Sequence, residues 1–252
     1  MAHAYEKLTH ERVLDAVESL GLSPDGRLLA LNSYENRVFQ IGIEDGPGVV
    51  GKFYRPQRWS DAAIREEHRF SLDLAAAEVP VVPPLRFADE TLFAHQGFRF
   101  TLFPRGGGRA PETDNLEHLE WIGRFIGRTH LLGQARAFVH RPRMDSQWYG
   151  WQARQTVLDG DMLPAEHAEH YRQLTTRLLE QVEQHFAQVQ PAYLRLHGDC
   201  HPGNILWTDA GPHLVDMDDS CNGPAVQDLW MLLSGDRQEM SLQLDALLEG
   251  YS

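Results

Sequence analysis

The densest group of chemically capable residues lies in the segment Leu196-His-Gly-Asp-Cys-His-Pro-Gly-Asn-Ile-Leu-Trp207, followed closely by Val215-Asp-Met-Asp-Asp219. Asp199 and Asn204 stand five residues apart in the first segment, and Asp216 leads the polar run of the second. Short apolar runs bracket both segments, so the polar side chains are predicted to occupy tight loops held by strands. Two carboxylates and an amide in such loops suit phosphoryl transfer. One carboxylate accepts or positions a hydroxyl proton, while the amide and the other carboxylate hold Mg²⁺ against phosphates through hard oxygen ligands.

Length and composition exclude several classes of protein. The chain has 252 residues, of which 42% are apolar, so it is globular, with one large domain or two lobes. It contains no apolar run approaching about 18 residues and no basic-then-apolar leader, so neither a membrane span nor a secretory signal is expected. The net charge of −13 gives no general attraction for nucleic-acid backbones. Two cysteines, Cys200 and Cys221, cannot form a disulfide framework. We therefore expect a cytoplasmic monomer with no nucleic-acid or membrane partner.

Hydrophobic periodicity and turn residues divide the chain into three parts: a β-rich part at 1–103, a glycine-rich linker at 104–112 and a mostly helical part at 113–252. The predicted helices are Thr9–Gly21, Asp61–Ala77, Asn115–Leu132, Ala165–Val189 and Ala225–Leu233. The predicted strands of the first part are Arg27–Asn32, Val38–Ile43, Val49–Tyr54, Leu85–Ala88 and Phe98–Phe103. Further apolar runs at Tyr193–Leu196, Ile205–Trp207 and His213–Val215 bracket the polar loops. A β-rich part followed by a helical part predicts an α+β architecture.

The spacing His-x-Asp-x-x-x-x-Asn, with a later aspartate, resembles the catalytic loop of protein kinases and of the aminoglycoside and choline phosphotransferases. The form HGDCHPGNILW followed by Asp-Met-Asp-Asp is more similar to the phosphotransferase branch. Within that branch, the sequence resembles the bacterial stress response kinase A family of RdoA/YihE-type kinases. The resemblance is carried by that loop together with LNSYENRVFQI at 31–41, GKFYRP at 51–56 and NGPAVQDLWMLLSGD at 222–236, and it covers essentially the whole chain.

The resemblance implies a bilobal protein-kinase-like fold and ATP-dependent, Mg²⁺-dependent phosphorylation of serine or threonine in protein substrates. Residues 1–103 would be the ATP-binding N-lobe, 104–112 the hinge or linker, and 113–252 the helical C-lobe. By motif position, Asp199 and Asp216 are the expected catalytic residues, and Asn204 and Asp216 the magnesium ligands. The expected ATP-binding residues are Ser33 in the phosphate loop, Lys52 on the third strand, and Glu67 on the following helix as the partner of Lys52. The adjacent Glu66 is left open as an alternative partner, and Leu102 to Arg105 fits the hinge that meets adenine.

Two features depart from the family pattern. The phosphate loop, Ser33-Tyr-Glu-Asn36, has no G-x-G-x-x-G, so its cradle must use Ser33 and backbone amides instead of glycine flexibility. Related kinases also carry further helices after the point where this sequence stops, so we expect its helical part to be truncated.

Less specific interpretations apply to single residues. His197 is expected to brace the loop backbone, and Asp228 to be a buried acceptor for catalytic-loop amides. A zinc site at His197, Cys200 and His201 lacks a paired ligand motif, and the Asp216–Asp219 run lacks the glycine and glutamate of a calcium loop. Lys52 alone could be a surface lysine, and Gly106–Gly108 is interpreted as a flexible linker, because no Walker Lys-Ser/Thr follows it.

The sequence leaves two other functions open. A small-molecule phosphotransferase acting on an amine-bearing alcohol would use the same loop, and its acceptor preference would lie in the C-terminal helices. A nucleotide-binding scaffold is disfavoured, because every residue that catalysis needs is present.

Overall fold

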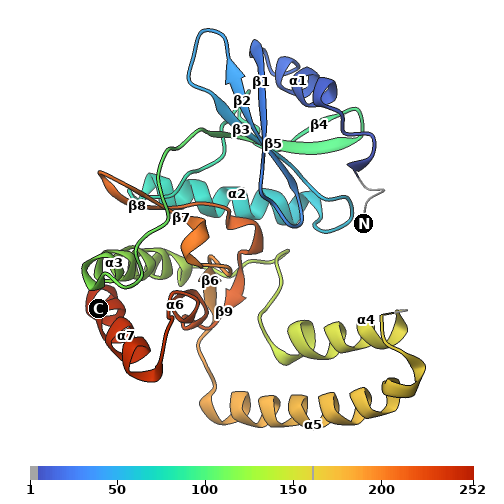
Figure 1. The fold of residues 1–252 in the computed structure, drawn as a ribbon, viewed down its shortest axis with the longest axis vertical. Helices are drawn as coiled ribbons and strands as arrows, with labels where there is room; N and C mark the ends of the chain where they lie inside the picture. The colour runs from blue at the N-terminus through green and yellow to red at the C-terminus, as the bar shows by residue number, and fades with distance from the viewer. Residues whose placement is uncertain (1–4, 161) are drawn as a thin grey trace.

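A five-stranded antiparallel sheet forms the first half of the chain, and helices dominate the second half, in the computed structural model, which describes residues 5–160 and 162–252 (Figure 1). The strand order is β1–β2–β3–β5–β4. The strands are β1 (Pro24–Leu31), β2 (Arg37–Ile43), β3 (Val49–Phe53), β4 (Phe93–His95) and β5 (Phe98–Pro104). We call this sheet, together with α1 (His10–Glu18) and α2 (Asp61–Ala76), the N-lobe, and residues 113–252 the C-lobe.

The N-lobe core lies between the sheet and α1. Thr9 caps α1 by accepting a hydrogen bond from the backbone N–H of Arg12, and the buried face of the helix packs on the aromatic residues of β2, β3 and β5. In the β2–β3–β5 register, Lys52 lies opposite Val38 on one side and Thr101 on the other. The sheet therefore holds Lys52 at its centre, with ladder partners on both neighbouring strands.

The predicted strand at Leu85–Ala88 is wrong. Strand β5 instead pairs with Phe93–His95. Ala88 and Asp89 have φ values of 48° and 65°, and such left-handed residues turn the chain out of an extended ladder. Only an isolated bridge between Phe87 and Glu90 forms there.

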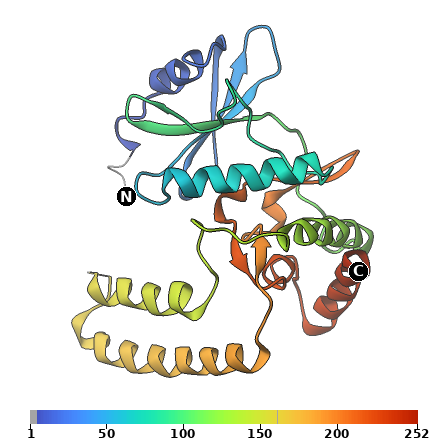
Figure 2. The same cartoon turned by 180° about the vertical axis from the view of Figure 1, so that it is seen from behind.

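Helix α2 lies between the sheet and the C-lobe helices (Figure 2). Its residues Phe70 and Leu74 belong to the same buried cluster as Leu119, Ile122 and Ile126 of the C-lobe. Because α2 contributes to a core that crosses the boundary between the lobes, the two lobes share hydrophobic packing.

The C-lobe surrounds a set of short strands and turns. Its helical elements are α3 (Leu116–Gly133), the π-helix η2 (Ser146–Gln152), α4 (Ala153–Asp159), α5 (Ala165–Val189), η3 (Pro202–Asn204), η4 (Met217–Asp219), α6 (Gln227–Trp230) and α7 (Arg237–Tyr251). Its strands are β6 (Leu194–Leu196) paired with β9 (Cys221–Gly223), and β7 (Ile205–Thr208) paired with β8 (Gly211–Leu214). Every helix in the part of the chain that the structure describes is too short or too polar to cross a lipid bilayer.

Close backbone contact joins α3 to α7. A Cβ atom on Gly123 would lie 2.1 Å from the carbonyl oxygen of Leu247, and one on Gly250 would lie 1.9 Å from that of Glu120. Only glycine permits this approach at either position. The predicted helix at Ala225–Leu233 is shorter in the structure, where α6 is a single turn.

A helical arm formed by η2, α4 and α5 projects from the C-lobe in both views (Figures 1 and 2). Helix α5 matches its predicted bounds, whereas the sequence predicts no element over Ser146–Asp159. Glu183 joins the two sides of the arm, accepting hydrogen bonds from Ser146 and from the indole N–H of Trp151. The aromatic residues of the 146–152 segment, Trp148, Tyr149 and Trp151, are interrupted by a glycine and do not recur with a helical period that the sequence could display.

The linker at 104–112 lies against β7. Arg109 and Trp207 exchange two backbone hydrogen bonds of 3.1 and 2.7 Å. A Cβ atom on Gly108 would lie 2.9 Å from Cβ of Leu206, so the chain passes directly over this strand. The segment predicted to be flexible is therefore hydrogen-bonded to the C-lobe in this structure.

Candidate active site

The predicted catalytic loop, residues 197–204, leads from β6 into η3 and brings Asp199 and Asn204 together. The amide nitrogen of Asn204 donates hydrogen bonds to the backbone oxygen of Asp199 at 2.9 Å and to its Oδ2 at 3.2 Å. The Asp199 side chain is 37% exposed, so its carboxylate can meet a substrate. The spacing of five residues thus places the two side chains side by side, as the sequence predicts.

Asp228 of α6 lies beneath this loop and holds its backbone. Its carboxylate accepts hydrogen bonds of 2.8 Å from the N–H groups of both His197 and Gly198, and one of 3.0 Å from Nε2 of His130. Burial raises the pKa of Asp228, but the hydrogen bond from His130 and the other donors lower it below its usual value. The prediction that Asp228 is a buried acceptor for catalytic-loop amides is confirmed.

Gly198 is required by the path of the catalytic loop. Its φ is +88°, and a Cβ atom there would lie 2.1 Å from the backbone oxygen of Asp219. The catalytic loop and the segment after Asp216 therefore touch through backbone atoms, which only glycine allows.

His197 braces the loop, as predicted. Its Nε2 lies 2.9 Å from the backbone oxygen of Val215, and its Nδ1 accepts the N–H of Asp199 at 3.3 Å. Both ring nitrogens are thus engaged with backbone. For the zinc alternative, no cluster of three His, Cys, Asp or Glu side chains suited to a metal occurs within residues 5–160 and 162–252.

The second polar segment places Asp216 opposite β3 of the N-lobe. Asp216 has a left-handed backbone, with φ 57°, and a side chain that is 47% exposed. Its Oδ1 accepts a hydrogen bond of 2.6 Å from Nζ of Lys52. The structure therefore joins the predicted metal-binding aspartate to the predicted phosphate-binding lysine across the two lobes.

Lys52 is buried, which rules out the interpretation of a solvated surface lysine. Burial alone would lower the pKa of Lys52, but the carboxylates of Asp216 and Asp218 raise it well above its usual value. The lysine is thus held as a cation at the boundary between the lobes.

The structure separates the roles of Glu66 and Glu67. Glu66 accepts backbone N–H groups of Val139, His140 and Arg141, which ties α2 to the C-lobe. Glu67 is buried on the side of Lys52, and burial raises its pKa to about 7. Among the described residues, the ion pairs of Lys52 go to Asp216 and Asp218, so Glu67 acts on the lysine through its field and not through a direct pair.

Ser33 and the hinge lie at the N-lobe side of the site. Ser33 is half-buried in the turn between β1 and β2. At the predicted hinge, the carbonyl oxygen of Leu102 accepts the N–H of Leu85, and the N–H of Arg105 donates to the carbonyl oxygen of Gly48. Those two backbone groups are therefore already used within the protein.

Three residues that the sequence reasoning does not assign complete the site. Asp218 accepts hydrogen bonds from the Asn36 amide at 3.1 Å and from Arg58, and Arg58 also contacts Asp219 at 2.6 Å. The Asp-Met-Asp-Asp run points to Asp218 only as a possible calcium ligand. Asn36 and Arg58 carry no signal in the sequence, because their partners lie more than 150 positions away.

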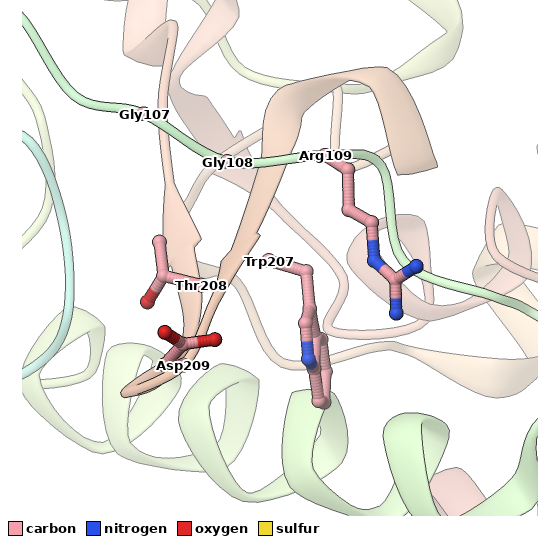
Figure 3. Close-up of a pocket in the computed structure, with 6 residues that line it drawn as sticks. All are labelled: Gly107, Gly108, Arg109, Trp207, Thr208 and Asp209. Carbon is pink, nitrogen blue, oxygen red and sulfur yellow. The ribbon is translucent and has the colours of Figure 1, made fainter.

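A pocket of about 670 Å³ opens beside the linker (Figure 3). It is lined by Gly107, Gly108, Arg109, Trp207, Thr208 and Asp209. The Trp207 ring forming one wall stacks on His118 of α3, with ring centroids 3.7 Å apart. The pocket is thus built from the linker and the β7–β8 hairpin, which follow the hinge and the catalytic loop.

Comparisons with known proteins agree with this geometry. A model described as the phosphotransferase enzyme family matches residues 27–252. Stress response kinase A of Salmonella choleraesuis and serine/threonine protein kinase RdoA of Salmonella typhimurium are each 46% identical over 250 residues, which are 99% of this chain and 76% of theirs. Stress response kinase A of Escherichia coli K12 is 45% identical over the same share of each chain.

Solved structures share the fold. A complex of amicoumacin kinase with AMP-PNP, Ca²⁺ and Ami has a TM-score of 0.78 at 18% identity, covering 99% of this chain and 79% of that one. A microcompartment-associated aminopropanol kinase has a TM-score of 0.71 at 18% identity, covering 95% and 80%. The expected resemblance to stress response kinase A and the α+β, bilobal, kinase-like fold are confirmed.

Proposed function

The chain belongs to the phosphotransferase enzyme family, and its relatives identify it as a kinase; from that premise we propose that it transfers the γ-phosphate of ATP, with Mg²⁺, to serine or threonine hydroxyls of proteins. The observation that carries the proposal is the 46% sequence identity to a serine/threonine protein kinase, which extends over 99% of this chain. The juxtaposition of Asp199 with Asn204, and of Lys52 with Asp216, supports it.

Asp199 would orient the acceptor hydroxyl. Its carboxylate is fixed by Asn204 yet remains partly exposed, so one oxygen can accept the hydroxyl hydrogen and take the proton as transfer completes. The Asp228 contacts below the loop keep that carboxylate in place, which is how a positioned general base gains its effect.

The oxygen atoms of Asn204 and Asp216 fit a magnesium ion. The amide nitrogen of Asn204 is used on Asp199, which leaves its carbonyl oxygen as the ligand atom, and Asp216 supplies a partly exposed carboxylate. Mg²⁺ bound there would neutralise charge on the transferred phosphate. One amide and one carboxylate suit an ion whose other ligands are phosphates and water.

Lys52 would bind the phosphates of ATP. In the structure it is paired with Asp216, so nucleotide binding exchanges this carboxylate for phosphate oxygens while the lysine stays charged. Ser33, on the loop that faces this region, is proposed to contact the phosphates, and Glu67 to maintain the field around Lys52.

A second candidate is a small-molecule phosphotransferase. Amicoumacin kinase and aminopropanol kinase share the fold, and a cationic acceptor would suit an acidic protein. At 18% identity these neighbours bear on the fold alone, so the protein acceptor ranks first.

The deciding experiment measures transfer from labelled ATP with Mg²⁺ to a generic basic protein and, separately, to a panel of aminoglycosides. Asp199→Ala should lower turnover by about 10²–10⁴-fold and leave ATP affinity largely intact, because it removes a general base and no phosphate ligand. Asp45→Ala, in the exposed β2–β3 turn, is the matched control and should keep wild-type turnover.

Each outcome separates the candidates. Label on protein serine or threonine that is lost in Asp199→Ala supports the protein kinase. Label only on the small molecules supports the second candidate. Near-normal turnover in Asp199→Ala would show that the role assigned to Asp199 is wrong, and ATP binding with no transfer at all would indicate a scaffold.

A further inference from the structure

A single buried carboxylate, that of Asp218, joins the phosphate-binding side of the site to the C-lobe. Its side chain is only 5% exposed. Oδ2 accepts hydrogen bonds from Arg58 and from the Asn36 amide, and Oδ1 lies 3.4 Å from Nζ of Lys52. The backbone oxygen of the same residue accepts a hydrogen bond from Arg141. Asp218 is therefore held by the C-lobe at its backbone and by the N-lobe at its side chain.

The three side-chain donors come from separate N-lobe segments. Asn36 ends the turn between β1 and β2, Lys52 lies on β3, and Arg58 lies between β3 and α2. Because all three donors contact the same carboxylate, a substitution at Asp218 would remove a contact from each of these three N-lobe segments.

Asn36 is the last residue of the phosphate loop, Ser33–Asn36, and connects this carboxylate to it. It is 3% exposed, donates its amide to Asp218, and accepts the backbone N–H of Arg55 at 3.1 Å through Oδ1. Both functional groups of the amide are thus used, and a neighbouring ion pair between Glu35 and Arg55 holds the same turn. The end of the phosphate loop is fastened by side chains.

The phosphate loop contains no glycine, and these side-chain contacts compensate for that absence. A glycine-rich loop places its backbone amides close to phosphates, because it lacks side chains and bends freely. A loop without glycine loses that freedom, so its position over the phosphates must come from contacts elsewhere. Tyr34, at the tip, is 87% exposed, whereas the side chains of Asn36 and Glu35 anchor the loop, together with the Tyr5 hydroxyl, which donates to the backbone oxygen of Glu35 at 3.1 Å.

Lys52 has a related dependence on Asp218. Oδ1 of Asp218 is buried and accepts no hydrogen bond from the described residues, and its ion-pair partner is Lys52. If Asp216 were engaged by a metal ion, Asp218 would still form an ion pair with the lysine.

We propose that Asp218 is a positioning residue that holds the phosphate loop, through Asn36, and Lys52 in register with the segment that carries Asp216. The inference rests on the proposed function, since it assumes that Ser33 and Lys52 meet the phosphates of ATP. Asp218 touches no substrate in this scheme. It acts by fixing two N-lobe groups relative to one C-lobe group, so its loss should affect ATP more than the acceptor.

The test measures Mg·ATP binding by titration calorimetry in the full chain, together with KM for ATP and for the acceptor. Asn36→Ala should weaken ATP binding by at least about ten-fold, because it removes the buried hydrogen bond to the charged Asp218 and the one from the Arg55 N–H, and leave KM for the acceptor unchanged. Asn36→Asp should weaken it further, because two carboxylates then face each other.

A reversed pair provides the sharpest comparison. In Asn36→Asp combined with Asp218→Asn, the amide at 218 donates to the carboxylate at 36, and that carboxylate still accepts the N–H of Arg55. This double variant should bind ATP at least about three-fold more tightly than Asn36→Asp alone, although Lys52 and Arg58 have each lost Asp218 as a carboxylate partner. Rescue of this kind is not expected from a residue that only adds stability.

Thermal unfolding without nucleotide separates binding from folding. Asn115→Ala is the matched control: it removes the cap of α3, whose side chain accepts the N–H groups of Glu117 and His118, and it should lower the melting temperature without changing ATP affinity. ATP affinity within two-fold of the wild type in Asn36→Ala, or a reversed pair no better than Asn36→Asp, overturns the proposal. Failure of the wild-type protein itself to bind Mg·ATP would overturn the proposed function and this role with it.

Discussion

Two buried carboxylates, Asp228 and Asp218, hold the two sides of the active site by different means. Asp228 lies within the C-lobe, and its donors are two backbone N–H groups and His130. Asp218 lies between the lobes, and its partners are Lys52, Arg58 and Asn36. Asp228 fixes the backbone of one loop in its own lobe. Asp218 instead binds three side chains of the N-lobe.

The contrast matches what each side of the site must do. A general base must keep one position throughout the reaction, which short hydrogen bonds to backbone in a dry environment provide. The phosphate side must exchange carboxylates for a nucleotide, which ion pairs between side chains allow. Burial raises the pKa of Asp218, but the nearby cations Lys52, Arg58 and Arg141 lower it by more, so the net pKa lies below its usual value. The aspartate therefore stays charged and continues to attract these cations.

The strongest test of this contrast is Asp228→Ala. It leaves two backbone N–H groups and His130 without their acceptor, so unfolding free energy should fall by about 3–5 kcal/mol. Urea unfolding measures the loss, and Asp228→Asn, which keeps one acceptor oxygen, should lose less. A decrease below about 1 kcal/mol would mean that water replaces the carboxylate and that the loop does not depend on it.

The variant Glu67→Gln tests the electrostatics on the side of the site that contains Asp218 and Lys52. Burial raises the pKa of Glu67 to about 7 from the usual value of 4.5. Between these two values the folded protein holds a proton that the unfolded chain has released, so the contribution of Glu67 to stability falls as pH rises and is lost above about 7. Glu67→Gln cannot ionise, so its stability relative to the wild type should rise between pH 5 and pH 8, by an amount on the order of 3 kcal/mol.

Urea unfolding of both proteins, without nucleotide, at pH 5 and at pH 8 checks this expectation. Comparing the two chains at each pH cancels the other titrating groups. A stability difference that stays constant with pH would show that Glu67 is ionised in the folded protein throughout this range.

Arg58→Gln should have the smallest effect. Arg58 pairs with Asp219, whose side chain is 40% exposed, and with the buried Asp218, which keeps Lys52 and Asn36 as partners, so the loss should be about 1 kcal/mol. Because water reaches the Arg58–Asp219 pair, that part of the difference from wild type should shrink between about 0.05 M and about 1 M salt, whereas the cost of Asp228→Asn should not. Equal salt dependence in the two variants would remove the distinction between the two carboxylates.

Elements with a strong local pattern could be predicted. Helix α5 matches its predicted bounds, and α2 and α3 match within a residue or two, because their periodicity is local and Ser60 and Asn115 cap α2 and α3 from the positions just before them. The predicted Leu85–Ala88 strand fails because its last residue, Ala88, and the next residue, Asp89, are left-handed, and the 146–159 helices escape prediction because their stability comes from contacts with α5.

Local spacing in the sequence is the basis for predicting which residues perform the chemistry, because Asp199, Asn204 and Asp216 belong to short segments. It also indicated that Asp228 supports the loop. The packing of the two lobes was needed to show that Glu66 binds the C-lobe backbone while Glu67 faces Lys52, two adjacent glutamates that the sequence could not separate. The same packing brings Asp218 to Asn36, which lies 182 positions earlier in the chain. Contacts of that range depend on how the lobes pack together, and no spacing within a segment records them.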